Sequence, residues 1–566
     1  MADDGSNTDG FMTEHMEFAD QLAGYVESEH PEFLVNKLYY DAYKKDMTAG
    51  TYPDVRSGLQ KLLKDGLLLF NYTGHGGTTA LSDEKVLTQT DINQFTYTHL
   101  PVWVTATCDF TRFDDLNTSA GEDVFLNKSS GGIALFTTVR VAYSRPNFPI
   151  NDNVIRNLFE RNNGRRRTLG EVMQATKNTL SSVYKLGFCL IGDPAVKMAY
   201  PEFGMKVTTV NGQSVDGNSI SFKALEKITV EGEVLDASGQ LVTDFTGIVN
   251  PTVKDSKVTV TCLKNSNKDD SPAFTFTDYP NTIFIGNDSV RNGKFSFTFT
   301  VPKDISYSNL QGKMNLYAVD TESGNEAQGN FDNFIVGGTS DTAETDTIGP
   351  EIRALYLNDT TFVDGGQVNT TPYFVAELWD KSGVNITGSS VGHDMMLVID
   401  ESTVLSYNLN SYYELLLGED GTGIVKFPIP ALEPGKHTAE FWVWDILNNS
   451  TVRTFTFEVV EGLKPFLFDV IATPGIAREQ VTFHLMHNRP ESRMRVGIMV
   501  YDLAGRQLWK HEESGTSGLF ENYTVSWDLT SGGARMRPGV YIYRAAISTD
   551  NSKDATKARK FIILGE

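Results

Sequence analysis

A cysteine and a histidine stand where they could form a nucleophilic pair. His75 lies in the stretch NYTGHGG, residues 71–77, which directly follows the apolar run of residues 67–70. Cys108 closely follows a second apolar run, residues 102–106. A thiol becomes a strong nucleophile when a base removes its proton, and an imidazole titrates in the right pH range. If the two runs are neighbouring parallel strands, both side chains lie at the edge of the sheet where ligands bind in open α/β folds.

The glycines around His75 allow tight turns and the close approach of a ligand. Taken alone, a histidine between glycines is also typical of an ordinary turn, and the second run ending near Cys108 favours catalysis over that interpretation. The other two cysteines are predicted to be structural. Cys189 lies among apolar residues, and Cys262 lies on an alternating, strand-like segment.

The elements that must position this pair alternate between helix and strand. Helical spacing is present in residues 11–26 and 55–63, and Thr168 with Glu171 has the spacing of a capping box. Continuous apolar runs at 67–72, 102–106 and 133–138 are typical of buried strands. Helices that alternate with such strands predict a parallel sheet covered on both faces, over residues 1–203.

The remaining sequence has a different pattern. From Met205 onward, apolar and polar residues alternate in short runs broken by Gly, Asn and Asp. This pattern predicts three β-sandwich domains of the Ig-like kind, over residues 204–338, 339–462 and 463–566.

Composition limits the classes of partner and compartment. A chain of 566 residues is too long for one hydrophobic core. Its 72 acidic and 49 basic side chains give a net charge of −23, which repels phosphate backbones and argues against nucleic acid as a partner. Three cysteines without a CxxC pair are too few for a disulfide scaffold. No apolar run approaches the roughly 18 residues of a membrane span, and the first residues do not form a signal peptide. A cytosolic protein and an excised piece of a secreted protein both fit.

The order of motifs resembles a known family. The His-Gly strand end, the strand ending at Cys108, Gly-Gly-Ile-Ala at 131–134 and Ile-Gly-Asp-Pro at 191–194 resemble the gingipain family of cysteine peptidases. The gingipain family belongs to a larger clan of cysteine peptidases that also includes caspases and legumains. The resemblance covers roughly residues 1–200 and implies a caspase-like α/β peptidase domain. The family's domain extends further toward the N-terminus, so we expect an early strand and a preceding domain to be missing here.

The resemblance also implies roles for single residues. Cys108 would attack the scissile carbonyl, His75 would transfer protons, and the N–H groups of Gly76 and Cys108 would stabilise the oxyanion. An acidic residue before the first helix orients the histidine in the family. We expect Asp4 in this role, with Asp3 as the alternative and a solvated turn as the other interpretation for both. Thr107 precedes the cysteine, where the family commonly has a smaller residue.

Substrate selection is predicted from the loop at residues 137–143. Gingipains use an acidic residue to select basic side chains, whereas this loop offers Val139 and Arg140 as candidate substrate-binding residues. We therefore expect a small or polar residue before the cut, unless Arg140 points to solvent.

No cofactor and no catalytic metal are expected. The turn Asp114-Asp115 is a candidate for structural calcium, which gingipains bind. The basic run Arg161 and 165–167 is either a solvated loop or a site for an anionic saccharide or phosphate.

The last unit suggests a substrate. Motifs at 500–506, 527–529, 537–544 and 560–564 resemble, in this order, the C-terminal sorting domain of type IX secretion cargo. The whole chain thus resembles peptidases that remove this domain from cargo at the outer-membrane surface. The resemblance implies two kinds of protein partner, which are the cargo and other proteins of the outer-membrane attachment complex. The acyl-enzyme would pass to water or to an amine of an anionic lipopolysaccharide, and both outcomes stay open.

Two other functions are compatible with the sequence. One is a secreted adhesin or scaffold whose peptidase-like domain is inactive, although intact His75 and Cys108 argue against it. The other is a general secreted gingipain-like peptidase whose own C-terminal unit is removed.

Overall fold

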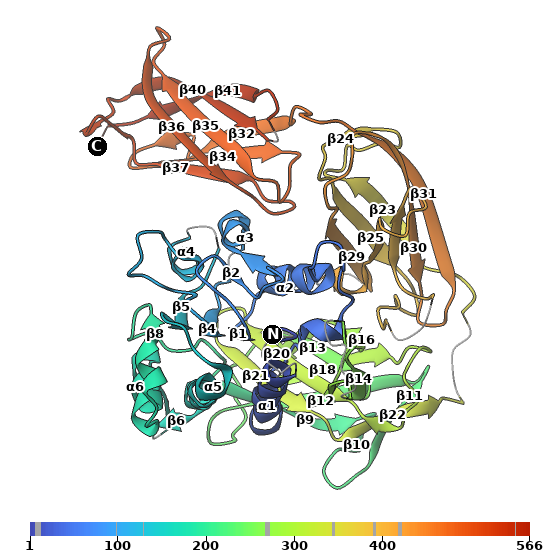
Figure 1. The fold of residues 1–566 in the computed structure, drawn as a ribbon. Coiled ribbons are helices and arrows are strands. Elements are labelled where there is room, and N and C mark those ends of the chain that lie inside the picture. The colour runs from blue at the N-terminus through green and yellow to red at the C-terminus, as the bar shows by residue number, and fades with distance from the viewer. Residues whose placement is uncertain are drawn as a thin grey trace.

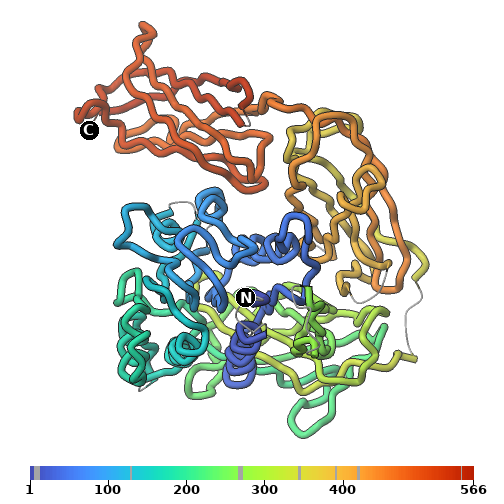
Figure 2. The backbone as a smooth tube through the Cα atoms, in the orientation of Figure 1, coloured from blue at the N-terminus to red at the C-terminus, as the bar shows by residue number. Residues whose placement is uncertain are grey.

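The fold consists of an N-terminal α/β domain and three β domains, as the computed structural model shows (Figure 1). The structure describes residues 1–565 except 6–12, 98, 128–129, 163, 266–271, 342–345, 389–391, 417–420 and 550. In the backbone trace of Figure 2, the second domain lies against the first, the third lies beside both, and the C-terminal domain returns toward the first.

A four-stranded sheet forms the centre of the first domain, in the order β1-β4-β5-β8. Its strands are β1 (Leu69–Thr73), β4 (Val102–Ala106), β5 (Ala134–Thr138) and β8 (Phe188–Ile191). The first three are parallel, as their continuous apolar runs predict, and they begin or end within two residues of the predicted bounds. The fourth, which carries Cys189, is antiparallel to β5 and was not predicted as a strand of this sheet.

Helices cover both faces of this sheet. The helices are α1 (Glu14–Glu29), α2 (Pro53–Asp65), α3 (Gln89–Gln94), α4 (Ala120–Leu126), α5 (Ser144–Phe159) and α6 (Leu169–Thr179), with the 3₁₀ helices η1 (Tyr40–Ala42) and η2 (Val183–Gly187). Two short hairpins are β2 (Ala80–Leu81) with β3 (Leu87–Thr88), and β6 (Arg161–Asn162) with β7 (Arg165–Arg166). Side chains of α2, α3 and α4 pack on the face that carries Trp103, and those of α1, α5 and α6 pack on the face that carries Val102 and Val104. This separation follows from the alternation of side chains along β4.

The predicted capping box at the start of α6 is present. The Thr168 hydroxyl accepts the Glu171 N–H, and the Glu171 carboxylate accepts the Thr168 N–H. These bonds satisfy two backbone donors that the first turn of a helix otherwise leaves unpaired.

In the second domain, which the sequence predicts to be a β-sandwich, the large sheet closes on itself. Ala327 and Gln328 of β21 pair with Phe203 and Gly204 of β9. The strands are β9 (Phe203–Val210), β10 (Gln213–Ser214), β12 (Lys227–Leu235), β13 (Gly247–Lys254), β16 (Thr282–Ile285), β17 (Asp288–Arg291), β18 (Lys294–Thr300), β20 (Lys313–Asp320) and β21 (Glu326–Phe331). A small sheet adds β11 (Ile220–Ala224), β19 (Leu310–Gln311) and β22 (Phe334–Thr339). Alternation identified the strands but not which of them pair.

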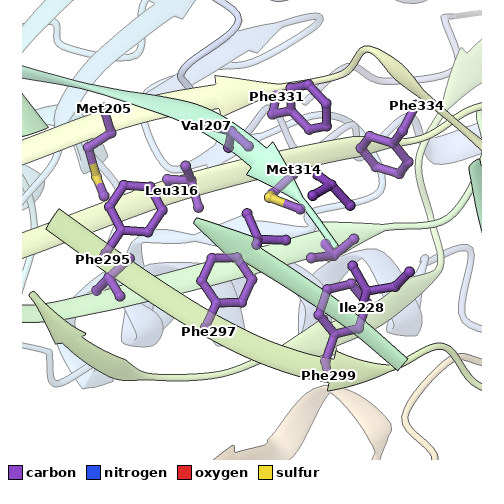
Figure 3. Close-up of a cluster of buried hydrophobic side chains, with 14 of the residues drawn as sticks. Met205, Val207, Ile228, Phe295, Phe297, Phe299, Met314, Leu316, Phe331 and Phe334 are labelled. Atoms are coloured by element: carbon purple, nitrogen blue, oxygen red, sulfur yellow. The ribbon is translucent and has the colours of Figure 1, made fainter. Parts of the chain in front are cut away.

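The inside of this sheet is apolar and rich in aromatic side chains. Figure 3 shows Phe295, Phe297 and Phe299 of β18 pointing the same way into the core. Met314 and Leu316 of β20 lie in the same core. The spacing of two residues puts all three phenylalanines on one face of β18.

The third domain has two sheets around one core, which spans residues 357–459. The first contains β23 (Glu351–Leu357), β25 (Tyr373–Trp379), β28 (Tyr413–Leu415) and β29 (Thr422–Pro428). The second contains β24 (Gln367–Val368), β26 (Met396–Ile399), β27 (Ser406–Asn408), β30 (Gly435–Trp444) and β31 (Ser450–Val459). The 3₁₀ helix η3 (Asn410–Tyr412) precedes β28.

The fourth domain also packs two sheets around one core, over residues 467–563. One contains β32 (Leu467–Thr473), β34 (Val481–His487) and β37 (Tyr523–Trp527). The other contains β33 (Ile476–Ala477), β35 (Met494–Tyr501), β36 (Gln507–Gly515), β40 (Gly539–Ser548) and β41 (Ala555–Ile563). A short hairpin joins β38 (Thr530–Ser531) to β39 (Ala534–Arg535). No helix in the described part of the chain is long and apolar enough to cross a membrane.

The first domain contacts the other three. A hairpin of the second domain, β14 (Val258–Thr261) with β15 (Thr275–Asp278), packs its buried Cys262 and Phe276 against Ala2 and Met16. On α2, Lys64 forms an ion pair with Glu491 of the fourth domain, with 2.9 Å between nitrogen and oxygen, and also lies over the ring of Tyr373 in the third. The buried contact of Cys262 agrees with the structural role expected for it.

Candidate active site

The two predicted catalytic residues lie at the same edge of the sheet. Thr73 at the end of β1 pairs with Ala106 at the end of β4. His75 and Cys108 each follow two residues after this pair. The register of two parallel strands therefore brings histidine and cysteine to equivalent positions, as the spacing of the apolar runs predicts.

Two glycines beside His75 are required by close contacts with the protein itself. A Cβ at Gly76 would lie 2.4 Å from the hydroxyl oxygen of Thr107, the residue before Cys108. A Cβ at Gly74 would lie 2.5 Å from the Tyr72 hydroxyl and 2.7 Å from the carboxyl carbon of Asp3. Both distances are too short for a side chain. The glycines thus hold the histidine loop against its neighbours, in addition to any role toward a ligand.

Asp3 is the acidic residue that faces the histidines. It is 1% exposed, and its Oδ2 accepts the backbone N–H of His75 at 2.6 Å. Its Oδ1 makes a very short contact with Nδ1 of His15. Asp4, favoured by the sequence, faces elsewhere: its Oδ2 accepts the Tyr52 hydroxyl at 2.6 Å and lies 3.6 Å from Nζ of Lys45. Successive side chains of extended backbone point to opposite sides, which explains the difference.

His15 is a member of the site that the sequence did not indicate. It lies in the first turn of α1, is 8% exposed, and its ring is perpendicular to that of His75 with 5.0 Å between centroids. Its neighbour Glu14 accepts Nε–H of Arg145 at 2.6 Å and also accepts the Ser144 hydroxyl. Helix α1 is thereby tied to the start of α5, near the loop that contacts Cys108.

The Cys108 thiol is half-buried and bonded to one backbone unit. Sγ donates to the Ala142 carbonyl at 3.0 Å and accepts the Ala142 N–H at 3.4 Å. Burial raises the pKa of Cys108; the bond to Ala142 counteracts this and the charge of Asp109 adds to it. The thiol is therefore protonated at neutral pH in this arrangement, and it needs a base to become a nucleophile.

The carboxyl of Asp3 is ionised. Burial by itself raises the pKa of Asp3, but the charge and hydrogen bond of His15 and the contacts with His75 outweigh it and lower the pKa overall. A buried carboxylate with two such partners supplies a fixed negative charge beside both imidazoles.

Two backbone donors face the same edge. Within the part of the chain that the structure describes, neither the N–H of Gly76 nor that of Cys108 donates a hydrogen bond to a protein acceptor. Both are the N–H groups that the family resemblance assigns to the oxyanion.

The two candidate substrate-binding residues have different surroundings. Val139 is 6% exposed and packs inside the domain, so it does not line an open surface. The Arg140 side chain is half-exposed, and its two terminal nitrogens bond the two carboxylate oxygens of Asp114 at 3.0 and 2.6 Å. The guanidinium is neutralised at the rim of the site.

The carboxylates of the acidic turn considered for calcium form ion pairs with arginines. Asp114 bonds Arg140, and Asp115 lies 3.6 Å from Arg112. Among the described residues, two other groups bring possible ligand atoms within 4.8 Å of one another: Asp3 with His15 and His75, and Asp346 with Asp380 and Asp445. The second group offers the oxygen ligands that calcium prefers.

The basic run is likewise paired with carboxylates. Arg161 and Arg166 contact Glu202, Arg165 contacts Glu171, and Arg167 contacts Glu160. These partners reduce the positive charge that would attract an anionic saccharide.

Comparison with known proteins identifies the first domain. Residues 1–199 match the model of peptidase family C25. These residues form a domain of the gingipain family. The match confirms the resemblance stated for the histidine and cysteine strand ends.

Several solved structures are similar to the chain. Dimeric latent PorU from Porphyromonas gingivalis is 36% identical, covering 77% of this chain and 41% of that one, with a TM-score of 0.33. The Arg-specific cysteine proteinase gingipain R (RgpB) is 18% identical, covering 59% and 66%, with a TM-score of 0.29. The complex of the pro- and mature domains of Porphyromonas gingivalis RgpB is also 18% identical, covering 59% and 68%, with a TM-score of 0.28. No curated protein matches the chain. The chain thus spans about two fifths of the PorU chain that it resembles.

Proposed function

We propose that the chain is a cysteine endopeptidase in which Cys108 is the nucleophile and His75 the proton carrier. One observation carries the proposal. A domain of peptidase family C25 places His75 and Cys108 at equivalent positions beyond two paired parallel strands. An inactive scaffold would have no need to retain both side chains at one edge.

The chemistry balances with these two side chains. His75 takes the thiol proton as Sγ of Cys108 attacks the scissile carbonyl carbon, and the carbonyl electrons move to oxygen. As the tetrahedral intermediate collapses, the C–N bond breaks and the imidazolium gives its proton to the leaving amine. Water then attacks the thioester carbon while His75 takes a proton from it. The C–S bond breaks, the new carboxyl terminus leaves, and the imidazolium returns the proton to Sγ of Cys108.

Asp3 and His15 support this proton transfer. The carboxylate fixes the His75 backbone through the 2.6 Å bond and contacts the imidazole of His15, whose ring stands against that of His75. We infer that they position the His75 ring and stabilise its protonated form, which is the usual role of a buried carboxylate beside a catalytic histidine. Asp3 takes the role for which Asp4 was the first candidate.

The N–H groups of Gly76 and Cys108 would bind the oxyanion. Both lie at the edge that holds the nucleophile, and their freedom from protein acceptors supports this role. Backbone donors that are fixed in advance stabilise the developing charge without reorganisation.

The substrate we propose is the C-terminal sorting domain of type IX secretion cargo. The motif order of residues 463–566 supports it, because the same chain then carries a peptidase domain and a sorting-domain-like unit. A PorU-type signal peptidase would act at the outer-membrane surface beside other attachment-complex proteins. Its thioester would accept water or an amine of an anionic lipopolysaccharide, and the second acceptor would make the reaction sortase-like. It would need no cofactor.

The test uses cargo that bears a sorting domain. The natural full-length protein should release the domain, and Cys108→Ala should abolish release with an almost unchanged thermal melt. Cys189→Ala is the matched control, because this thiol is also half-buried but lies on β8. Sequencing the new terminus identifies the cut, and a thiol-reactive probe should label Cys108. Full activity in the Cys108→Ala protein would refute the proposal.

A further inference from the structure

Large apolar side chains are exposed on two segments beside the thiol. Val141 and Tyr143 follow β5 and are 64% and 66% exposed, and Val183 and Leu186 of η2 are 72% and 71% exposed. Tyr184 between them is 37% exposed. We refer to these five residues as the apolar rim. Contiguous apolar surface of this kind commonly marks a binding site.

The two segments form one surface. The N–H of Val139 donates to the carbonyl of Gly187 at 2.8 Å, which joins the start of one segment to the end of the other. The rings of Tyr143 and Tyr184 meet edge to face, with 6.0 Å between centroids. Side chains from both segments therefore lie together on the apolar rim.

This surface is continuous with the nucleophile. Ala142, whose carbonyl and N–H both bond Sγ of Cys108, lies between Val141 and Tyr143 in the chain. A polypeptide whose scissile carbonyl reaches Sγ therefore comes within one residue of the positions that carry Val141 and Tyr143. The apolar rim is thus placed where it can contact residues on one side of the cut.

The charged side chains of both segments are bonded to other groups of the protein. The Arg140 guanidinium is bonded to Asp114, and Nζ of Lys185 donates to the carbonyls of Lys177 and Leu180, the first at 2.8 Å. Neither cation is left to recruit an acidic substrate residue, and no carboxylate on these segments selects a basic one. The surface discriminates by apolar contact.

We propose that the apolar rim binds an aliphatic or aromatic side chain that flanks the scissile bond of the polypeptide substrate. This inference rests on the proposed peptidase function and adds a substrate class to it. The residue directly before the cut remains small or polar, and the apolar residue occupies a neighbouring position. Filling an apolar subsite discriminates by about 10- to 200-fold.

Binding is measured with the Cys108→Ala protein, so that no turnover occurs. Fluorescent peptides with leucine or phenylalanine at one flanking position are compared by anisotropy with peptides that carry serine there. At one of the flanking positions, the peptide with leucine or phenylalanine should bind at least about 10-fold more tightly than the peptide with serine. The double variant Tyr143→Ser/Leu186→Ser should reduce this ratio to below about 3-fold. Val363→Ser, an exposed valine of the third domain, should leave it unchanged.

Equal binding of both peptides at every position, or a ratio kept by the double variant, overturns the inference. A photoreactive phenylalanine at the flanking position gives a second measurement without any change to the rim. It should cross-link to residues 141–143 or 183–186, and cross-links confined to other segments overturn the inference even if the double variant unfolds.

Failure of the proposed function has a different signature. Cys108-dependent cleavage with no preference for flanking apolar residues rejects the rim and keeps the peptidase. Apolar peptides that bind and cross-link at the rim, with no Cys108-dependent cleavage by the unmodified protein, support the rim and reject the peptidase.

Discussion

The two sides of the candidate active site are built differently. On the histidine side, His75 lies between glycines that pack against Thr107 and Asp3, and a buried carboxylate bonds its backbone. On the cysteine side, the thiol bonds one backbone unit, and the adjoining segment exposes Val141 and Tyr143. Under the proposed function, the histidine side fixes the geometry of proton transfer, and the cysteine side leaves surface for a substrate.

The largest effect should come from removing the charge on the histidine side. Asp3→Asn replaces a carboxylate that contacts His15 and the His75 N–H, and it should lower kcat/KM by about 10²- to 10⁴-fold. His15→Ala should lower it less, with partial recovery in His15→Asn. Steady-state kinetics on sorting-domain cargo measure both.

Asp4→Asn is the matched control for this prediction. It removes a neighbouring buried carboxylate that bonds Tyr52 and lies near Lys45. We expect a lower melting temperature but a kcat/KM within about 10-fold of the unmodified protein, which is below the range of a catalytic acid or base. A larger decrease in kcat/KM for Asp4→Asn than for Asp3→Asn would show that Asp4, rather than Asp3, orients His75.

A second prediction concerns packing between the two sides. Gly76→Ala places a methyl group 2.4 Å from the Thr107 hydroxyl oxygen, so the free energy of unfolding should fall by about 1–3 kcal/mol. Gly77→Ala is the control, because a Cβ there meets no atom within 4 Å. Denaturant unfolding measures both. The double variant Gly76→Ala/Thr107→Ala should recover part of the loss, and equal losses for the two glycine variants would contradict the packing argument.

A third prediction concerns the thiols. Burial raises the pKa of Cys108, so its thiol stays protonated to higher pH than that of a short cysteine peptide. Its alkylation rate, followed by mass spectrometry, should therefore still rise at a pH where the peptide has reached its plateau. Burial raises the pKa of Cys262 to about 12, and this thiol should stay unlabelled in the folded protein. A plateau for Cys108 at lower pH than for the peptide would show a thiolate already formed.

Sequence patterns predicted the parts of the site that depend on local order. Continuous apolar runs identify β1 and β4 as buried parallel strands, and their register then brings His75 and Cys108 to one edge. The capping box of Thr168 and Glu171 is likewise a local pattern.

The acidic partner could not be predicted in the same way. Asp3 and Asp4 are chemically equivalent neighbours, and the direction of each side chain depends on how Ala2 bridges Thr73 and Tyr39, which are distant in sequence. His15 joins the site because helix α1 packs beside β1, and no short motif records that contact. The closed sheet of the second domain was missed for the same reason, since alternation does not specify which strands pair.

The smallest effect is expected from the ion pair between Arg140 and Asp114, on the cysteine side of the site. Arg140 and Asp114 are both exposed, and exposed ion pairs contribute little to stability, so Arg140→Ala should leave the melting temperature unchanged. The unmodified protein should cleave substrates with Ser, Ala or Asn before the cut faster than those with Lys or Arg. Arg140→Ala frees the Asp114 carboxylate and should raise cleavage of the basic substrates a few-fold, and Asp114→Asn in the same chain should remove that gain. Faster cleavage of Lys or Arg substrates by the unmodified protein would mean that another acidic group selects them, and that this side of the site does not discriminate by apolar contact alone.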